Sequence, residues 1–464
     1  MNDASELVEK LTYKQKHIAE IDPSVKEKAT AYCEEYKSFL DASKTEREFT
    51  QNAISMLVKA GYVEFCDKTK YKAGDKVYVN NRDKSVIAST IGKKSLANGV
   101  RMVASHIDSP RLDLKPNPLY QDNDMALFKT HYYGGIKKYQ WVTIPLSLHG
   151  VVCLKNGEKI EINIGEKHGD PVFYISDLLP HLSSEQYKKS LYEGIKAEEL
   201  NIIVGSVPFE AEDVSNKVKL NVLSILNEMY NITEKDFLRA EIEAVPNYKA
   251  SDVGFDRSLI GAYAHDDKVC AYASLVSEIE LKNPEFTSVC ALTDKEETGS
   301  DGNTGLNSDY LYHYLERLAQ MQDVDYKEMF RNTKCLSADV NAGLDPTFPS
   351  VHEKYNAAKL NYGCVITKYT GVRGKGDTSD ANAEMMAYVT DILDDANVVW
   401  QTGELGANDV GGGGTVAKYI ANRNIDVIDI GIPLLSMHAP MEIASKLDIY
   451  MLYKAFEAFL KVNE

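Results

Sequence analysis

Two kinds of apolar periodicity divide the chain. After about residue 245, short apolar runs such as Val289–Leu292 and Val427–Ile432 alternate with longer segments such as Asp267–Leu281 and Tyr310–Met321, whose apolar residues recur at helical spacing. The short runs predict buried strands, and the longer segments predict helices. Strands that alternate with helices are typical of a mainly parallel sheet with helices on both faces. We therefore predict an α/β fold for this part of the chain.

The segment from about residue 117 to 245 has a different pattern. Lys159–Ile164 alternates strictly between polar and apolar residues, and Val142–Val152 alternates in the manner of strands. The segment therefore predicts a β-rich unit with its own core. The simplest organisation is an α/β domain made of residues 1–116 and 246–464, interrupted by this insertion.

The residues on either side of the insertion predict one shared sheet. Thr45 and Glu48 have capping-box spacing at the start of an expected helix, and Asp380–Leu393 predicts another helix. Val100–Ala104 predicts a strand that ends just before His106. If His106 shares a site with residues after the insertion, the sheet must be assembled from both flanks.

The bulk composition narrows the class of protein. The 464 residues include 52 lysines and arginines against 69 aspartates and glutamates, so the net charge is −17. This balance argues against a general nucleic-acid or anionic-membrane surface. The seven cysteines are scattered without a C-x-x-C pair, which predicts reduced thiols. The charged N-terminus lacks a signal-peptide core, and no window reaches the apolar length of a membrane span, so we expect a cytoplasmic protein.

Candidate chemistry begins at the adjacent carboxylates Glu296 and Glu297, which follow Val289–Leu292. Neighbouring acids at a strand end repel each other, and a bound cation is one reason for them to be there. For an isolated pair, a solvated turn is the ordinary alternative. Further residues of metal-binding type stand beside apolar runs or at the start of an expected helix: His106, Asp108, Asp266, Asp267, Asp339 and His438.

Ligands of mixed imidazole and carboxylate type suit Zn²⁺, with Co²⁺ or Mn²⁺ as alternatives, and offer too few oxygens for Ca²⁺. In open α/β sheets such groups collect at the carboxyl ends of strands. Each residue alone has an ordinary explanation, since Asp266 and Asp267 could simply cap a helix. The glycine run Gly411–Gly414 lacks the Lys-Ser/Thr of a phosphate-binding loop, and no Gly-x-Ser-x-Gly occurs. Only the combination is specific.

Five short motifs carry a resemblance to a known family. They are Ser105-His-Ile-Asp-Ser-Pro110, Asp266-Asp267, Asp294-Lys-Glu-Glu-Thr-Gly-Ser300, Ser337-Ala-Asp339 and Met437-His438. Their order resembles the aspartyl aminopeptidase family of co-catalytic dizinc exopeptidases over nearly the whole chain. The resemblance implies a phosphorylase/hydrolase-like fold, in which a mixed, mainly parallel sheet is sandwiched by helices, with an inserted β-rich dimerisation domain at 117–245. It also implies a dimer-based homo-oligomer, such as a tetrahedral dodecamer.

The resemblance also implies roles for individual residues. Two Zn²⁺ per subunit would be held by His106 and Asp339, by Glu297 and His438, and by a bridging Asp266, while Glu296 would be the general base, Asp108 would orient His106, and His181 would reach a neighbouring subunit's active site. The implied reaction is release of the N-terminal residue from peptides with a free amino terminus.

The sequence departs from acid-selective members of that family at one position. Their substrate-binding lysine has its counterpart one place away here, at Lys368 after Thr367, and adjacent strand positions face opposite sides. We therefore expect neutral or basic N-terminal residues as substrates. Two alternatives stay open: another dimetal amidohydrolase, such as a dipeptidase, carboxypeptidase or deacetylase, and an inactive assembly protein of the same fold.

Overall fold

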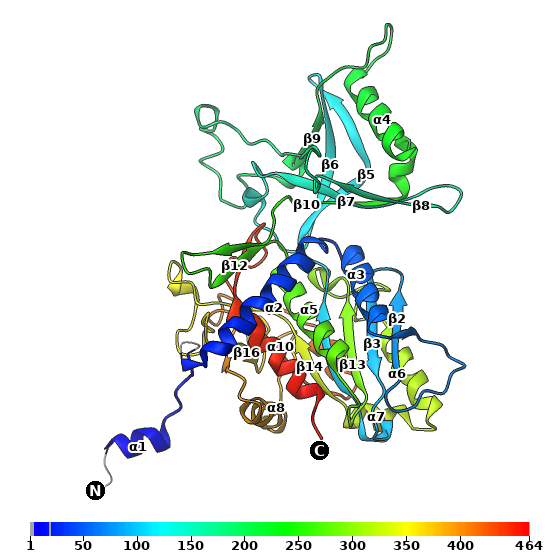
Figure 1. Ribbon diagram of the computed structural model, residues 1–464. Coiled ribbons are helices and arrows are strands. Elements are labelled where there is room, and N and C mark those ends of the chain that lie inside the picture. The colour runs from blue at the N-terminus through cyan, green and yellow to red at the C-terminus, as the bar shows by residue number, and fades with distance from the viewer. Residues whose placement is uncertain (1–3, 18–19, 464) are drawn as a thin grey trace.

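The computed structural model describes residues 4–17 and 20–463. Figure 1 shows a larger α/β body and a smaller unit above it that is built around a second sheet. The larger body contains a nine-stranded sheet, and the smaller unit contains a six-stranded sheet. No helix in the described ranges combines the length and apolar character needed to cross a membrane.

The nine-stranded sheet has the order β1-β2-β3-β13-β4-β14-β18-β16-β17. Its four central strands, β13, β4, β14 and β18, run parallel, while β3 and β16 pair antiparallel to their inner neighbours. The predicted mixed sheet with helices is therefore confirmed. The strands are β1 (Val63–Glu64), β2 (Lys76–Asn81), β3 (Ser85–Thr90), β4 (Arg101–His106), β13 (Ser288–Thr293), β14 (Lys334–Ala338), β16 (Cys364–Thr367), β17 (Trp400–Thr402) and β18 (Asp426–Gly431).

Helices cover both faces of this sheet because its strands are apolar on both sides. Val103 and Leu336 belong to one hydrophobic cluster, and their neighbours Met102 and Cys335 belong to another. One face packs against α2 (Pro23–Asp41), α3 (Glu46–Lys59), α5 (His265–Glu280), α8 (Ala383–Asp395) and α10 (Lys446–Leu460), and the other packs against α6 (Tyr310–Met321), α7 (Tyr326–Asn332) and α9 (Ala417–Ala421).

Local capping decides where two of these helices begin. Thr45 and Glu48 form the predicted capping box at the start of α3. The helix expected from Asp380 begins only at Ala383, because the Asn382 side chain accepts a hydrogen bond from the Met385 N–H and caps the helix there.

The six-stranded sheet is antiparallel throughout, in the order β8-β7-β10-β5-β6-β9. It has its own apolar core, which includes Phe128, Trp141 and Ile202. The strand expected from Val142 begins only at Leu146. Its elements are β5 (Arg111–Asp122), β6 (Met125–Tyr133), β7 (Leu146–Cys153), β8 (Lys159–Ile164), β9 (Asn201–Gly205), β10 (Ala240–Pro246) and the covering helix α4 (Lys217–Tyr230). The division into domains at residues 117 and 245 stays a prediction.

Two small sheets complete the described fold beside the main one. β11 (Ser251–Val253), β12 (Leu259–Ala262) and β20 (Glu442–Ser445) form a three-stranded sheet, and β15 (Asn341–Ala342) pairs with β19 (Pro433–Leu434). The N-terminal helix α1 (Ala4–Leu11) stands away from the body (Figure 1).

Candidate metal centre

The candidate ligands meet because three neighbouring strands end at the same edge of the main sheet. β4 ends at His106, β13 ends shortly before Glu296 and Glu297, and β14 ends just before Asp339. These strands are adjacent and parallel, so their carboxyl ends lie side by side. Two more residues come from α5 and from the loop after β19. Together they form what we call the metal-centre residues: His106, Asp266, Glu296, Glu297, Asp339 and His438.

Asp266 lies between the two imidazoles. Its Oδ1 is 3.3 Å from Nε2 of His106, and its Oδ2 is 3.1 Å from Nε2 of His438. The His106 Nε2 is also 3.8 Å from Oε2 of Glu296 and 4.0 Å from Oδ1 of Asp339. The His438 Nε2 is 3.5 Å from Oε1 of Glu297. All five residues predicted as metal ligands, and the predicted base, are therefore brought together.

Two buried carboxylates hold the backbone of four metal-centre residues. Asp108 accepts the N–H of Glu296 at 3.1 Å and the N–H of Glu297 at 3.2 Å. Glu442 accepts the N–H of Asp266 at 3.0 Å and the N–H of His438 at 2.7 Å. Sequence reasoning did not find Glu442, because one glutamate in a short strand carries no local signal.

Backbone carbonyls orient both imidazoles. Nδ1 of His106 lies 3.0 Å from the carbonyl oxygen of Asp108, and 3.4 Å from its carboxylate. Asp108 therefore contacts His106 most closely through its main chain. Nδ1 of His438 lies 2.8 Å from the carbonyl oxygen of Gly135. A carbonyl only accepts, so Nδ1 donates in each case and Nε2 is left to face the cluster.

The charge balance of the cluster favours a cation. Among the described residues, no lysine or arginine makes an ion pair with the four acidic metal-centre residues, Asp266, Glu296, Glu297 and Asp339. Burial raises the pKa of Glu297 and of Asp339 well above the usual range, and it raises the pKa of Glu296 to about 7. Although burial opposes it, Asp266 and Glu297 raise the pKa of His438 to about 10.

The donor set fits zinc. The Oε1 atom of Glu297 is buried and has no hydrogen-bond partner, as expected of an atom that awaits a ligand. Donor atoms of His106, Glu296 and Asp339 lie within 4.8 Å of one another, and so do those of His106, Asp266 and Glu297. Imidazole nitrogens and carboxylate oxygens are ordinary zinc ligands.

A cavity of about 570 Å³ is lined by all the metal-centre residues except the buried His106. Thr367 at the end of β16, Asn341 and the buried Asp429 also line it. Lys368 is absent from this lining and lines a different cavity, and its ammonium pairs with Asp380. The two neighbouring residues Thr367 and Lys368 thus face different spaces.

His181 is the predicted site residue that the chain does not bring to the cluster. It lies exposed in the short 3₁₀ helix η4 (Pro180–Leu182) of the smaller unit and does not line the cavity. Its expected place at a neighbouring subunit's site stays a prediction.

Comparison with known proteins gives the family. The model of the aminopeptidase I zinc metalloproteases (M18) matches residues 39–460. A probable M18 family aminopeptidase 1 of Borrelia garinii is 48% identical over 438 residues, which cover 93% of this chain and 95% of the relative. The crystal structure of an M18 family aminopeptidase from Thermotoga maritima is 44% identical, has a TM-score of 0.93, and is matched over 97% of this chain and 100% of that one. The S. cerevisiae mApe1 dodecamer shares the fold at 21% identity with a TM-score of 0.75, over 92% of this chain and 96% of that chain.

The chain belongs to the M18 family and is a zinc aminopeptidase. This confirms the predicted family and the predicted zinc aminopeptidase activity.

Proposed function

We propose that the metal-centre residues bind two zinc ions and release the N-terminal residue from peptides with a free amino terminus. The observation that carries this proposal is the Asp266 carboxylate, which directs one oxygen toward each imidazole. His106 and Asp339 would complete one zinc site, and Glu297 and His438 the other. Zinc ions held there would polarise the scissile carbonyl and acidify the attacking water.

Glu296 is the proposed general base and acid. Its carboxylate takes a proton from the attacking water and returns it to the departing amine nitrogen. Because burial raises its pKa to about 7, the carboxyl is suited to gaining and losing a proton near neutral pH. Asp108 accepts a hydrogen bond from the Glu296 N–H and thereby fixes the backbone from which the Glu296 side chain extends.

The cavity favours neutral or basic N-terminal side chains. Thr367 pairs with the carboxylate-bearing Asp429 on the neighbouring strand, so an acidic side chain would meet a like charge there. Lys368 lines a different cavity and is absent from the lining of this one. Lys418 also lines the cavity, but its ammonium lies 3.6 Å from Asp377, which offsets its positive charge.

The smaller unit is the proposed contact between subunits. Several large apolar side chains are exposed around His181, which is unusual for a surface that faces only water. They are Leu178, Leu179, Leu182, Tyr187, Leu191 and Tyr192. A second copy that covers this surface would bring His181 to a neighbouring site.

All seven cysteines are free, which supports a cytoplasmic location.

The test compares Glu296→Gln with Glu297→Gln. Release of amino acids from a panel of amino-acid 4-nitroanilides should fall about 10²–10⁴-fold in Glu296→Gln, because the proton carrier is lost. Its zinc content, measured by mass spectrometry, should stay near two ions per chain. Glu297→Gln should instead lose zinc. Full turnover by Glu296→Gln would remove that residue from the role of base.

A further inference from the structure

The smaller unit reaches into the metal centre of its own chain. β6 ends at Tyr133, and the two glycines that follow lie close to Glu297 and His438. A Cβ on Gly134 would lie 3.1 Å from Oε2 of Glu297, and a Cβ on Gly135 would lie 3.3 Å from Nδ1 of His438. This 133–135 segment therefore leaves little room for side chains at its two glycines.

Tyr133 acts on the ligands through one carboxylate. Its hydroxyl donates to Oδ2 of Asp108 at 2.7 Å. The same carboxylate accepts the N–H groups of Glu296 and Glu297, and the same residue's carbonyl oxygen orients His106. A shift of the Asp108 carboxylate would thus move the proposed base and two proposed ligands together.

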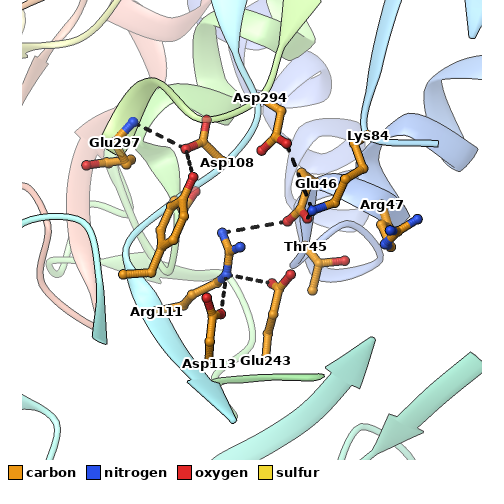
Figure 2. A network of polar contacts seen from close by, with 12 residues as sticks. Thr45, Glu46, Arg47, Lys84, Asp108, Arg111, Asp113, Glu243, Asp294 and Glu297 are labelled. Atoms are coloured by element: carbon orange, nitrogen blue, oxygen red, sulfur yellow. Dashed lines mark hydrogen bonds and ion pairs between the residues drawn. The ribbon is translucent and has the colours of Figure 1, made fainter. Parts of the chain in front are cut away.

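The Tyr133 ring is fixed in turn by Arg111. The guanidinium carbon lies 3.8 Å from the ring centroid. Figure 2 shows that Arg111 belongs to a salt-bridge network between the two units, whose members are the buried Glu46, Arg111 and Glu243 and the more exposed Lys84 and Asp113. Nε of Arg111 is 2.9 Å from Asp113 and 3.1 Å from Glu243. A displaced ring would lose its contact with the guanidinium that these ion pairs hold in place.

Gly135 acts on the other side of the cluster. Its carbonyl oxygen accepts from Nδ1 of His438 at 2.8 Å, which fixes the tautomer that presents Nε2 to the ligands. His438 has a φ of 63°, and Glu442 holds its N–H, so its backbone position is also set. The 133–135 segment therefore touches both halves of the metal centre.

We propose that Tyr133 and Gly135 are positioning residues for the metal centre, so that the smaller unit completes the active site of its own subunit. Tyr133 holds Asp108 and, through it, the backbone of Glu296 and Glu297, while Gly135 holds the His438 imidazole. This inference rests on the proposed two-zinc function. It adds a requirement that the α/β body alone does not meet.

The test replaces the Tyr133 hydroxyl and leaves the ring on Arg111. In Tyr133→Phe, zinc affinity measured by chelator competition, or kcat, should fall about 10–100-fold, as is typical when a group that orients metal ligands is removed. KM should change little. The visible absorption of the Co²⁺-substituted protein should also shift, because the ligand geometry changes.

Tyr62→Phe is the matched control. Tyr62 is also buried and donates to the Glu278 carbonyl at 2.8 Å, but it makes no contact with the metal-centre residues. Tyr133→Phe behaving like Tyr62→Phe in zinc affinity, cobalt spectrum and kcat would overturn the inference. A second variant, Gly135→Ala, should perturb the same spectrum by pushing the His438 ring.

The outcomes separate this inference from the proposed function. A wild-type protein that binds zinc but releases no N-terminal residue would overturn the function. The cobalt spectrum and zinc affinity of Tyr133→Phe would still report on positioning, because neither requires turnover.

Discussion

Two groups of buried carboxylates lie on either side of Tyr133, and they are neutralised in different ways. In the salt-bridge network, Glu46 is 3.0 Å from the Lys84 ammonium, and Glu243 is 3.1 Å from the Arg111 guanidinium. In the metal centre, the acids form ion pairs only with imidazoles among the residues that the structure describes. The carboxylates named here are largely buried, so both groups need positive charge.

The contrast teaches where an external ion is required. Arg111 and Lys84 come from the chain itself and are present whenever it is folded. Among the described residues, no lysine or arginine forms an ion pair with the carboxylates of the metal centre. One group therefore joins the two units permanently, whereas the other depends on the supply of zinc.

The largest expected effect comes from removing the guanidinium of the network. Arg111→Met should lower the free energy of unfolding by about 3–5 kcal/mol, because breaking a buried pair leaves carboxylates without compensation. Denaturant unfolding measures the loss. Arg47→Met is the control: its partner Glu241 is half exposed, so the loss should stay below about 1 kcal/mol. Equal losses in both variants would contradict the distinction between buried and exposed pairs.

Zinc removal should have the next largest effect. At a free zinc concentration a hundredfold above its Kd, binding at one site stabilises the fold by about 2.7 kcal/mol. Thermal unfolding should therefore occur at a clearly lower temperature in chelator than in zinc. Glu297→Gln should show a smaller difference between the two conditions. The same melting temperature for wild type with and without zinc would contradict a cation-dependent cluster.

The smallest effect concerns pH and a neighbouring contact between the units. Nδ1 of His149 is 2.7 Å from Glu48, and its Nε2 is 3.2 Å from Glu166. Although burial opposes it, these carboxylates raise the pKa of His149 above 6.5. Burial acts to raise the pKa of Glu48, but the hydrogen bond with the His149 imidazole lowers it below 4.5.

The direction of the pH effect on stability follows from the linkage between proton binding and folding. A histidine whose pKa is raised by folding contributes fully to stability below about pH 6.5, and this contribution is lost as the pH rises through the folded pKa. A carboxylate whose pKa is lowered by folding loses its contribution to stability as the pH falls below about 4.5. His149→Gln should therefore lower stability by about 1 kcal/mol near pH 5–6 and by less at pH 9. The exposed His313→Gln is the control. A difference that grows from pH 6 to pH 9 would refute this sign.

The sequence was informative where a feature is local. The capping box at Thr45 and Glu48, the parallel strands and the site's main residues follow from spacing and from motifs. Features that depend on distant segments were not predictable. Gly135 meets His438 across 303 positions, and Asp266 meets Glu442 across 176. No local pattern marks such partners, because a hydrogen bond to a backbone group leaves no residue-type signal.

The 133–135 segment sets a limit on how far this chain can be shortened. The nine-stranded sheet draws all its strands from outside residues 111–246, so a fragment without the smaller unit would retain every strand of that sheet. It would nevertheless lack the hydroxyl and the carbonyl that hold Asp108 and His438. Removing the smaller unit would therefore keep the strands of the main sheet and lose the two groups that hold Asp108 and His438.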